Sequence, residues 1–381
     1  MKRRGFLLAL AAFPALRAWA AGQAGAGQEQ ATAFAPVLPG RQLVFPRDHG
    51  AHPDFRTEWW YATGWLKLAD GSPLGFQITF FRVRTGIGED NPSAFAPRQL
   101  LLAHAAIADP RHGRLRHDQR SARSGFGRAT YAQETTDVRV GDWRFALVGD
   151  SYRAEVRGEE FAYALNLRPD APPLLNGKAG FSVKAPDPRH ASYYYSRPQL
   201  AVSGTLSLDG RAQPVSGRAW LDHEWSSELL PTAAQGWDWI GINLDDGGAL
   251  MAFRLRDHRQ GTLWAAATLR AAASARGADG AGQRAPASEI LAPEAVEFVP
   301  LRQWRSPRTG IEYPVEWRIR VGRRSFRLLP LLDDQELDSR RSTGAIYWEG
   351  AVRLQEEGRE DGPGGRGYLE MTGYGERIRV G

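Results

Sequence analysis

Three consecutive residues with acid–base side chains, Asp222, His223 and Glu224, lie between Trp220 and Trp225. Successive side chains of a β-strand point to opposite faces, so Asp222 and Glu224 would share one face with Trp220, and His223 the other with Trp225. Two carboxyl groups buried on one face raise each other's pKa, which suits a general acid. We therefore predict that Asp222, His223 and Glu224 are catalytic. The alternative is that these acids form an ion pair with an arginine.

A second acid begins an aromatic run, Glu58-Trp-Trp-Tyr61. By the same alternation Glu58 and Trp60 share a face, and both are candidate ligand-binding residues. Rows of aromatic side chains in barrels more often form the core, and an interior arginine would be the ordinary partner of a buried glutamate. His104, in Ala103-His-Ala105, is a further candidate for the ligand site.

The histidines of the first half raise the question of a metal site. His49 and His52 are three residues apart, Asp48 precedes them, and His104 lies further along the chain. This spacing is not that of the helical His-Glu-x-x-His motif, and the segment is rich in glycine and proline. We predict no metal site and histidines that cap turns or form hydrogen bonds. A polar-ligand or metal-binding module around His49 and His52 is the weakest of three functional hypotheses.

Several kinds of chemistry are excluded by what the sequence lacks. It contains no cysteine, which excludes disulfides, thiolate metal sites, a cysteine nucleophile and a lipid-anchored cysteine. It has no Gly-x-Ser-x-Gly elbow, no Walker loop and no dinucleotide-binding fingerprint. We therefore expect no cofactor.

The candidate residues lie in sequence with a strand pattern. The chain has 381 residues, 42% hydrophobic and 24% charged, which is a globular composition long enough for two domains. From residue 41 onward, aromatic and β-branched residues alternate with polar ones, and Asp-Gly pairs separate the runs. The alanine-rich stretch 271–288 is predicted to be a loop because it also contains glycine and arginine. We predict an all-β fold.

The strand pattern repeats once along the chain. Shifted by 176 residues, the Asp70-Gly71 hairpin and its flanking leucines fall on Asp246-Gly247. Shifted by 148 residues, Gly217-Arg-Ala-Trp-Leu-Asp222 falls on Gly365-Arg-Gly-Tyr-Leu-Glu370. Each unit has enough strands for a closed sheet of about eight. Glu370 lacks the residues that flank Asp222, so we expect the second unit to be inert.

The repeat sets the predicted organisation. We predict tandem antiparallel β-barrels, an N-terminal barrel at 42–228 and a C-terminal barrel at 236–381. Barrels of this size can hold one small ligand.

The first twenty residues have the pattern of an export signal. The basic start Lys2-Arg-Arg4 precedes a short apolar stretch and the small-x-small sequence Ala18-Trp-Ala20. Arg3-Arg-Gly-Phe-Leu7 also matches the twin-arginine pattern, although it lacks the usual Ser or Thr, so both Sec and twin-arginine export fit. We predict a signal peptide at 1–20, a flexible leader at 21–41, and a periplasmic or secreted protein without an integral membrane segment.

The net charge does not indicate nucleic-acid binding. The chain carries +6 with a pI near 9.7, but the signal contributes four of these charges, from Lys2, Arg3, Arg4 and Arg17, which leaves 6 − 4 = +2. No basic stripe coincides with a nucleic-acid-binding motif, so we expect no nucleic-acid partner.

The chain resembles the AttH-like and carotenoid 1,2-hydratase-related lipocalin-like proteins over nearly all of the mature sequence, about 42–381. The segments that match are Asp48-His-Gly-Ala-His52, Thr57-Glu-Trp-Trp-Tyr-Ala-Thr-Gly64, Ala103-His-Ala105, Trp220-Leu-Asp-His-Glu-Trp225 and Gly236-Trp-Asp-Trp-Ile-Gly241. The resemblance implies two lipocalin-like barrels, in agreement with the repeat. Similar proteins include a cofactor-free hydratase of acyclic carotenoids and pericyclase-like enzymes.

For the site, the resemblance implies a role for Asp222, which matches the acid position of the hydratases. In those enzymes a carboxylic acid protonates a terminal C=C bond, and aromatic faces stabilise the carbocation. Tyr193 and Tyr195 lie where the hydratases carry His and Trp, so the resemblance does not extend to carotenoid specificity. Together with Trp220 and Trp225, these tyrosines are expected to line the site.

Two functions of different class follow. The first is a cofactor-independent lyase (hydratase) or isomerase that acts on a hydrophobic small molecule, such as an isoprenoid or lipid, with Asp222 as the proton donor. The second is a non-catalytic periplasmic lipid carrier that serves an ABC-type export system. A buried Asp222 that faces an open cavity without an arginine favours the enzyme, whereas a salt-bridged Asp222 or a filled cavity favours the carrier.

Overall fold

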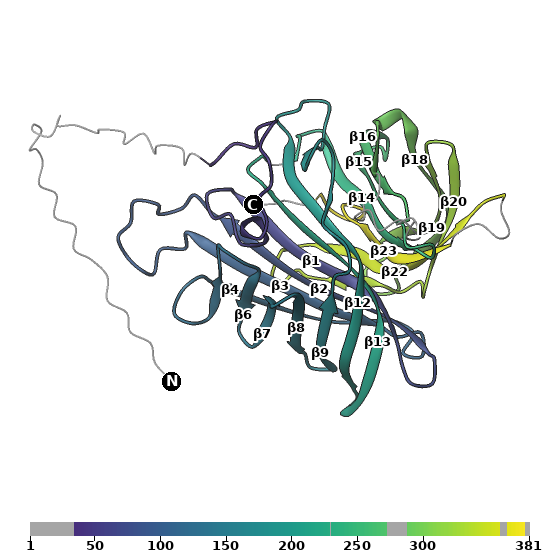
Figure 1. The fold of residues 1–381 in the computed structure, drawn as a ribbon, viewed down its shortest axis with the longest axis horizontal. Coiled ribbons are helices and arrows are strands. Elements are labelled where there is room, and N and C mark those ends of the chain that lie inside the picture. Colours follow the sequence, from purple (N-terminus) through teal and green to yellow (C-terminus); the bar gives the residue numbers. More distant parts are fainter. Residues whose placement is uncertain (1–33, 229, 273–287, 359–363, 378–381) are drawn as a thin grey trace, which may run out of the picture. The chain divides into compact units, whose positions relative to one another are not determined.

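The regular structure of the chain is almost entirely β-strand (Figure 1). A computed structural model describes residues 34–228, 230–272, 288–358 and 364–377. The predicted signal peptide 1–20, most of the leader and most of the alanine-rich stretch lie outside the described residues. Helical structure in the described chain is limited to two 3-10 turns, η1 (Arg47–His49) and η2 (Pro293–Ala295). The predicted all-β class is confirmed.

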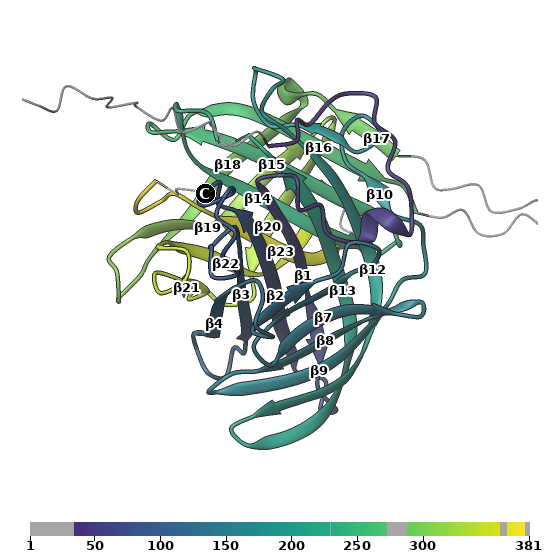
Figure 2. The ribbon, with the colours of Figure 1, turned by 90° about the vertical axis from the view of Figure 1, so that its left-hand side faces the viewer.

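The first sheet curls into a nearly closed antiparallel barrel (Figure 2). Its strand order is β4-β3-β2-β1-β13-β12-β9-β8-β7-β6-β5, and β10 and β11 also pair with β12. The strands are β1 (Thr57–Lys67), β2 (Pro73–Arg84), β3 (Gln99–Ala108), β4 (Leu115–Arg123), β5 (Ala129–Tyr131), β6 (Asp137–Val140), β7 (Trp143–Val148), β8 (Ser151–Arg157), β9 (Phe161–Arg168), β10 (Leu174–Leu175), β11 (Phe181–Val183), β12 (Ala191–Leu208) and β13 (Arg211–Ser226).

The second sheet is also antiparallel and forms a half-barrel. Its order is β17-β16-β15-β14-β23-β22-β20-β19-β18, and β21 pairs with β22. The strands are β14 (Ala234–Leu244), β15 (Ala249–Asp257), β16 (Thr262–Arg270), β17 (Ser288–Leu291), β18 (Val296–Arg305), β19 (Glu312–Val321), β20 (Arg324–Pro330), β21 (Glu336–Asp338), β22 (Ile346–Glu356) and β23 (Gly365–Met371). The predicted domain bounds, 42–228 and 236–381, stay predictions.

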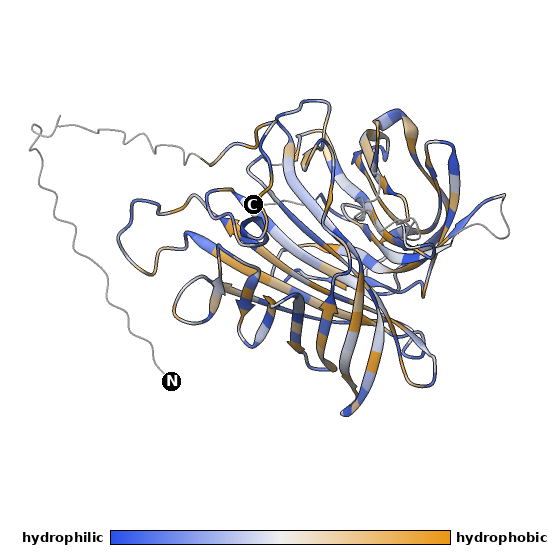
Figure 3. Cartoon of the chain, in the orientation of Figure 1, coloured by the Kyte–Doolittle hydropathy of each residue, from blue (hydrophilic) through white to orange (hydrophobic). Residues whose placement is uncertain are grey.

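Strands in the middle of the molecule are buried on both faces. In β8 and β9 buried residues alternate with more exposed ones, as in strands with one solvated face, and Figure 3 shows the matching bands of hydrophobic and hydrophilic residues. In β1, β14 and β15 nearly every residue is buried. One face of these strands lines its own sheet's core, and the other packs against the second sheet, where β1 contacts β23.

An aromatic cluster fills the space between the two sheets. The first sheet encloses its own core, which includes Trp60 and Leu221, and the second sheet has a separate core that includes Trp348. The third group, which we call the inter-sheet cluster, joins side chains from both sheets: Tyr61, Trp65, Leu174, Tyr194, Trp220, Trp239, Ala249, Met251, Phe253, Ala351 and Tyr368. Aromatic side chains bury large apolar areas, so this cluster holds the sheets together.

A tight turn aligns the two strands that carry most of the site. Asp209 and Gly210 connect β12 to β13 with φ angles of 51° and 76°. Two successive positive φ angles are the signature of a type I′ hairpin, for which Asp-Gly is a preferred pair. Among the described residues, no helix is long and apolar enough to cross a membrane.

Candidate functional site

Asp222 lies in β13 with its carboxyl group in the region between the sheets. It is 2% exposed. Three uncharged donors contact it: Tyr194 Oη donates to Oδ2 at 2.6 Å, Ser196 Oγ donates to Oδ1 at 2.5 Å, and Trp220 Nε1 donates to Oδ1 at 2.6 Å. Trp239 Nε1, from the second sheet, donates to the Tyr194 hydroxyl at 3.0 Å. In the described part of the chain no ion pair involves Asp222, so the carboxyl is buried without a cation.

Burial without a cation makes Asp222 a weak acid. Burial raises the pKa of Asp222 from 3.8 to about 7, although the hydrogen bonds from Ser196, Tyr194 and Trp220 act in the opposite direction. The nearby Glu224 carboxylate raises this pKa further. With a pKa near 7, about half of the molecules carry a protonated Asp222 at neutral pH.

A β-bulge decides which tyrosine meets Asp222. Between Arg197 and Leu200 the pairing of β12 with β13 shifts by one residue, and Gln199 adopts a φ of 61°. Beyond the bulge Ser196 lies opposite Asp222, and Tyr194 shares its face. The bulge is tied to the second sheet, because the backbone N–H of Gln199 donates to Asn243 Oδ1 at 2.6 Å. Neither Ser196 nor Tyr194 was among the predicted site residues.

Glu224 lies on the same face of β13 as Asp222, but a lysine neutralises its charge. Lys184 Nζ forms an ion pair with Glu224 Oε1 at 2.7 Å, and the Ser192 hydroxyl also donates to this oxygen. The Lys184 ammonium also lies 4.5 Å from the ring centre of Tyr194 and 4.6 Å from that of Phe253. An ion pair therefore forms at Glu224, with a lysine in place of the predicted arginine, and none forms at Asp222.

His223 points to the opposite face of β13, into the first sheet's interior. Its Nε2 lies 2.9 Å from Glu58 Oε1, and its Nδ1 lies 3.1 Å from the Tyr195 hydroxyl. Arg82 Nε donates to Glu58 Oε2 at 2.8 Å, and His52 Nδ1 lies 2.7 Å from Oε1. Glu58 is thus the centre of a buried polar network within the barrel, separate from Asp222.

The charges in this network are balanced. Although burial acts in the opposite direction, Arg82 and His52 hold the pKa of Glu58 well below its ordinary value. The pKa of His52 is raised, because Glu58 and Asp48 outweigh the effect of burial. Burial lowers the pKa of His223, which is therefore the neutral member. The interior arginine considered above as the partner of Glu58 is present as Arg82.

His52, Glu58 and His223 also have the composition of a metal site. Their candidate ligand atoms lie within 4.8 Å of one another, and all three residues are buried. Glu58 already accepts hydrogen bonds from the His52 backbone and from Arg82, and both histidine rings contact Oε1. The Arg82 guanidinium supplies the positive charge that a metal ion would bring.

The other predicted ligand-binding residues are divided among three places. Tyr193, Tyr195 and Trp225 form a cluster with Phe55 on the face of β12 and β13 away from Asp222, and Trp225 stacks on His52 with ring centres 3.7 Å apart. The other two lie elsewhere: the ring of Trp60 is 4.9 Å from that of His223 inside the barrel, and His104 Nδ1 is 2.7 Å from the Tyr347 hydroxyl between the sheets. Trp220 alone of the predicted aromatic residues contacts Asp222.

The second sheet contributes a pair of carboxyl groups that the sequence did not suggest. Glu349 in β22 and Glu370 in β23 are direct cross-strand partners, and Trp239 is the next residue across from Glu370. Glu349 is 2% exposed. No described residue forms an ion pair with either glutamate, and burial raises the pKa of Glu349 to about 7. Glu370, the repeat counterpart of Asp222, is half-buried beside Glu349, and the expectation that the second unit is inert stays a prediction.

The acidic pair and Asp222 belong to one electrostatic environment. The pKa of Glu370 is raised well above its ordinary value, mainly by burial and secondly by the Glu349 carboxyl, and Asp222 adds to this shift. Each of the two neighbouring carboxyl groups opposes the ionisation of the other, because like charges disfavour one another where burial already raises both pKa values. Tyr61 is the cross-strand neighbour of Asp222, and its pKa is raised by burial and by Glu349.

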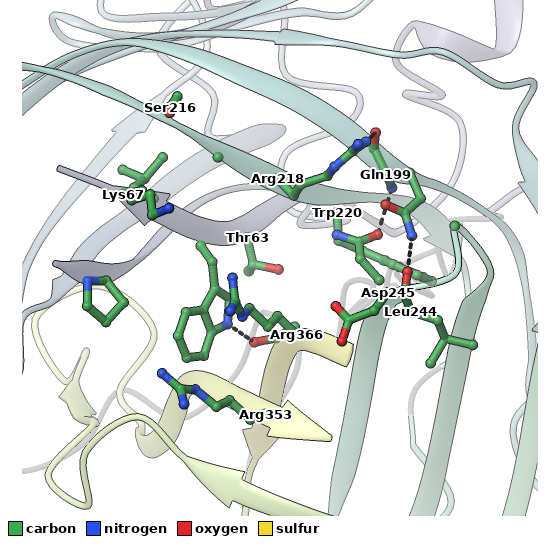
Figure 4. A pocket seen from close by; sticks show the side chains of 18 of the residues that line it. Thr63, Lys67, Gln199, Ser216, Arg218, Trp220, Leu244, Asp245, Arg353 and Arg366 are labelled. Atoms are coloured by element: carbon green, nitrogen blue, oxygen red, sulfur yellow. Dashed lines mark hydrogen bonds between the residues drawn. The ribbon is translucent and has the colours of Figure 1, made fainter. Parts of the chain in front are cut away.

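A cavity of about 700 Å³ has Trp220, a hydrogen-bond partner of Asp222, in its wall (Figure 4). Residues from both sheets line it, including Thr63, Trp65 and Trp220 from the first sheet and Arg366 from the second. Asp222 itself does not line the cavity, whereas Trp220 lines it and donates from its indole to the Asp222 carboxyl. Two conditions favour an enzyme. The first, that no arginine contacts Asp222, is met in the described residues. The second, that Asp222 faces an open cavity, is not met, because Trp220 and not Asp222 lines the cavity.

Comparisons with known proteins agree with this architecture. A protein assigned as AttH from Nitrosomonas europaea is 48% identical and superposes with a TM-score of 0.80, covering 90% of this chain and 100% of its own. Kievitone hydratase from Nectria haematococca is 15% identical with a TM-score of 0.62, covering 90% of this chain and 96% of its own, which shows a shared fold. No curated protein matches the sequence. The AttH-like family profile matches residues 36–374, and the chain therefore belongs to the AttH-like family.

Proposed function

We propose that the protein is a cofactor-independent lyase (hydratase) or isomerase of a hydrophobic small molecule, and that Asp222 is its proton donor. The observation that carries this proposal is a carboxyl group, 2% exposed, held by three neutral donors without a cation. A carboxyl kept neutral near pH 7 is what protonation of a weakly basic alkene requires. A hydratase shares this fold, which adds support.

For hydration, the proton balance closes within the site. The O–H bond of Asp222 breaks as its proton forms a C–H bond with one alkene carbon, which leaves a cation at the other. Water attacks that carbon, and the proton lost from the water passes to the Glu349–Glu370 pair. One water is added, and exchange with solvent returns a proton to Asp222. The faces of Trp220, Trp239 and Tyr61 supply the electron density that stabilises the cation.

The ligand proposed is an isoprenoid or lipid, because the walls around Asp222 are aromatic. Trp220 lines the cavity and contacts Asp222, which does not line it, so a movement of the Trp220 side chain would bring a ligand in the cavity to the acid. Trp220 is therefore proposed to gate access to the acid.

The test compares the wild type with Asp222→Asn and with Asp90→Asn, an exposed control. Mature protein is incubated with an isoprenoid and lipid extract of the source cells in water enriched in oxygen-18, and the products are analysed by mass spectrometry. We expect the wild type and Asp90→Asn to produce a species heavier by one labelled water, or an unlabelled isomer, and Asp222→Asn to produce neither. The same product from Asp222→Asn would contradict the assignment of the proton donor.

A non-catalytic lipid carrier that serves an ABC-type export system is the second candidate. The observation in its favour is that the 700 Å³ cavity has Trp220 and not Asp222 in its wall, so a ligand can bind there without meeting the acid. Identical lipids extracted in equal amounts from the wild type and Asp222→Asn, with no labelled product, would support the carrier and contradict the enzyme.

We also propose that the mature protein acts in the periplasm or outside the cell. The basis is the signal pattern of residues 1–20, with its Arg3-Arg4 pair. Replacing both arginines by lysine should retain the precursor in the cytoplasm if export uses the twin-arginine route. Normal export of that variant would indicate the Sec route.

A further inference from the structure

The cavity between the sheets carries more positive charge than its neighbours neutralise. Its lining contains five basic residues and three acidic ones. The basic residues are Lys67, Arg218, Arg270, Arg353 and Arg366, and the acidic ones are Asp170, Asp245 and Asp246. Figure 4 shows Lys67 and Arg218 on the first-sheet side of the cavity and Arg353 and Arg366 on the second-sheet side.

Arg353 and Arg366 form a like-charge pair on a single aromatic ring. They are direct cross-strand partners in β22 and β23, a position in which like charges destabilise a sheet. Their guanidinium carbons lie 5.3 Å and 5.5 Å from the ring centre of Trp65. Trp65 is fixed in turn, because its Nε1 donates to the carbonyl of Gly367 at 3.0 Å. The pair is therefore held at the cavity wall.

The described residues supply no carboxylate to this arginine pair. Elsewhere on the same sheet, arginines are matched with glutamates: Arg318 with Glu357 at 2.9 Å and Arg324 with Glu356 at 3.0 Å. No ion pair of the described chain involves Arg353 or Arg366. The cavity thus stands out as a place where the sheet's arginines lack a counter-charge.

A buried arginine at the same cavity provides an independent observation. Arg270, at the end of β16, is 4% exposed, and its Nε has no hydrogen-bond partner among the described residues. Among the described residues, Arg270 makes one hydrogen bond, a long contact of 3.4 Å from Nη1 to the carbonyl of Pro172. Burial lowers the pKa of Arg270, and Asp170 offsets this only in part. A buried guanidinium with free donors normally has an anion beside it.

We propose that this cavity binds the anionic group, carboxylate or phosphate, of an amphipathic ligand. Arg353 and Arg366 present planar forks of donors that suit bidentate contact with such oxygens, and Arg270 and Lys67 add charge. Trp65 and Trp220, also in the lining, offer apolar surface to the rest of the ligand. Where the ligand is also the substrate, which rests on the proposed function, this site fixes its polar end while the apolar part lies against Trp220, next to Asp222.

The test uses decanoate, its uncharged analogue decanol, and inorganic phosphate. Binding to the mature protein is measured by calorimetry for the wild type, for Arg353→Ala/Arg366→Ala, and for Arg318→Ala as an exposed control outside the cavity. We expect decanoate to bind the wild type and Arg318→Ala at least about tenfold more tightly than the double variant, and decanol to show no such difference, because one charge-assisted contact contributes about 1.5–3 kcal/mol. Phosphate should compete with decanoate for the wild type.

Each source of the anion has its own outcome. Phosphate that binds alone with affinity equal to decanoate would indicate a site for the free anion and would overturn the amphipathic part of the proposal. Equal decanoate affinity in the wild type and the double variant would overturn the whole proposal. Arg353 and Arg366 are exposed, so the double variant should fold, and an unchanged circular dichroism spectrum and melting temperature would establish this. Asp222→Asn should still bind decanoate, which separates this proposal from the catalytic one.

Discussion

Replacing Asp222 by asparagine should stabilise the protein at alkaline pH. Asparagine resembles the protonated carboxyl group: its oxygen can accept from Ser196 and Trp220, and its amide can donate to the Tyr194 hydroxyl. The wild type must instead ionise a buried carboxyl that has no cation near it. The variant therefore removes a cost that grows as the pH rises.

The magnitude follows from the shift in the Asp222 pKa. A carboxyl group with a raised pKa keeps its proton in the folded state over a pH range in which the unfolded chain has lost it. The protonated carboxyl makes its full contribution to the free energy of unfolding below pH ~4, and this contribution declines by about 1.4 kcal/mol per pH unit until pH ~7. Because the pKa of Asp222 rises from 3.8 to about 7, the stabilisation lost over this pH range amounts to about 4 kcal/mol. Asp222→Asn should gain that amount relative to the wild type between pH ~4 and ~8.

The assay is urea unfolding of the wild type, Asp222→Asn and the exposed control Asp90→Asn at a series of pH values. Glu349 and Glu370 titrate in all three proteins, so the difference between the first two isolates Asp222. Parallel stability curves for the wild type and Asp222→Asn would refute the reasoning, because they would mean that Asp222 is ionised in the folded protein as easily as in the unfolded chain.

Four further predictions test the surroundings of Asp222 and the separate Glu58 network. In the wild type, the hydrogen bond from Tyr194 favours the ionised form of Asp222. Tyr194→Phe removes this bond and should therefore raise the pKa of Asp222 further. A lower midpoint in a carboxyl titration would contradict this. Glu349→Gln should gain about 3 kcal/mol between pH ~4 and ~8, because the pKa of Glu349 is about 7 in the folded protein against 4.5. A loss of stability of this variant in urea unfolding at pH ~8 would contradict the raised pKa. Arg82→Met should lower the free energy of unfolding by about 3–5 kcal/mol, since Glu58 would remain buried without its main counter-charge. Added zinc should leave the melting temperature of the wild type unchanged. Zinc stabilisation of the wild type would show that the His52–Glu58–His223 cluster binds metal after all.

The fold was predictable because its signals are local. Alternation and Asp-Gly turns indicate strands and hairpins without knowledge of the partner strand, and the turn at Asp209 and Gly210 forms as expected. Alternation also placed Asp222 and Glu224 on one face and His223 on the other, and the structure has them so. What alternation does not give is which face points into a barrel.

The composition of the site was less predictable because it depends on one bulge. Counting back from the Asp209-Gly210 turn with regular pairing would place Arg197 opposite Asp222, and Tyr195 on the same face. The extra residue at Gln199 exchanges them for Ser196 and Tyr194. Pro198 within the shift is a local mark, because proline in a paired strand is typical of bulges, but the sequence does not show that Asn243 of the second sheet holds the bulge.

The acidic pair escaped prediction for a related reason. Glu349 and Glu370 are distant in sequence and become neighbours through the register of β22 and β23. The repeat did mark Glu370 as the counterpart of Asp222, but its flanking residues differ, and the sequence alone did not show that it would lie half-buried beside a second carboxyl.

The most direct measurement is a titration of the Asp222 carboxyl group itself. Carbon-13 labelled aspartate in the wild type and in Asp222→Asn would identify the single resonance that the variant lacks, and its chemical shift would be followed from pH ~4 to ~9. The account predicts a midpoint near pH 7 for that resonance. A midpoint below pH ~5, close to that of an ordinary aspartate, would show that the group is ionised at neutral pH and would contradict its role as proton donor.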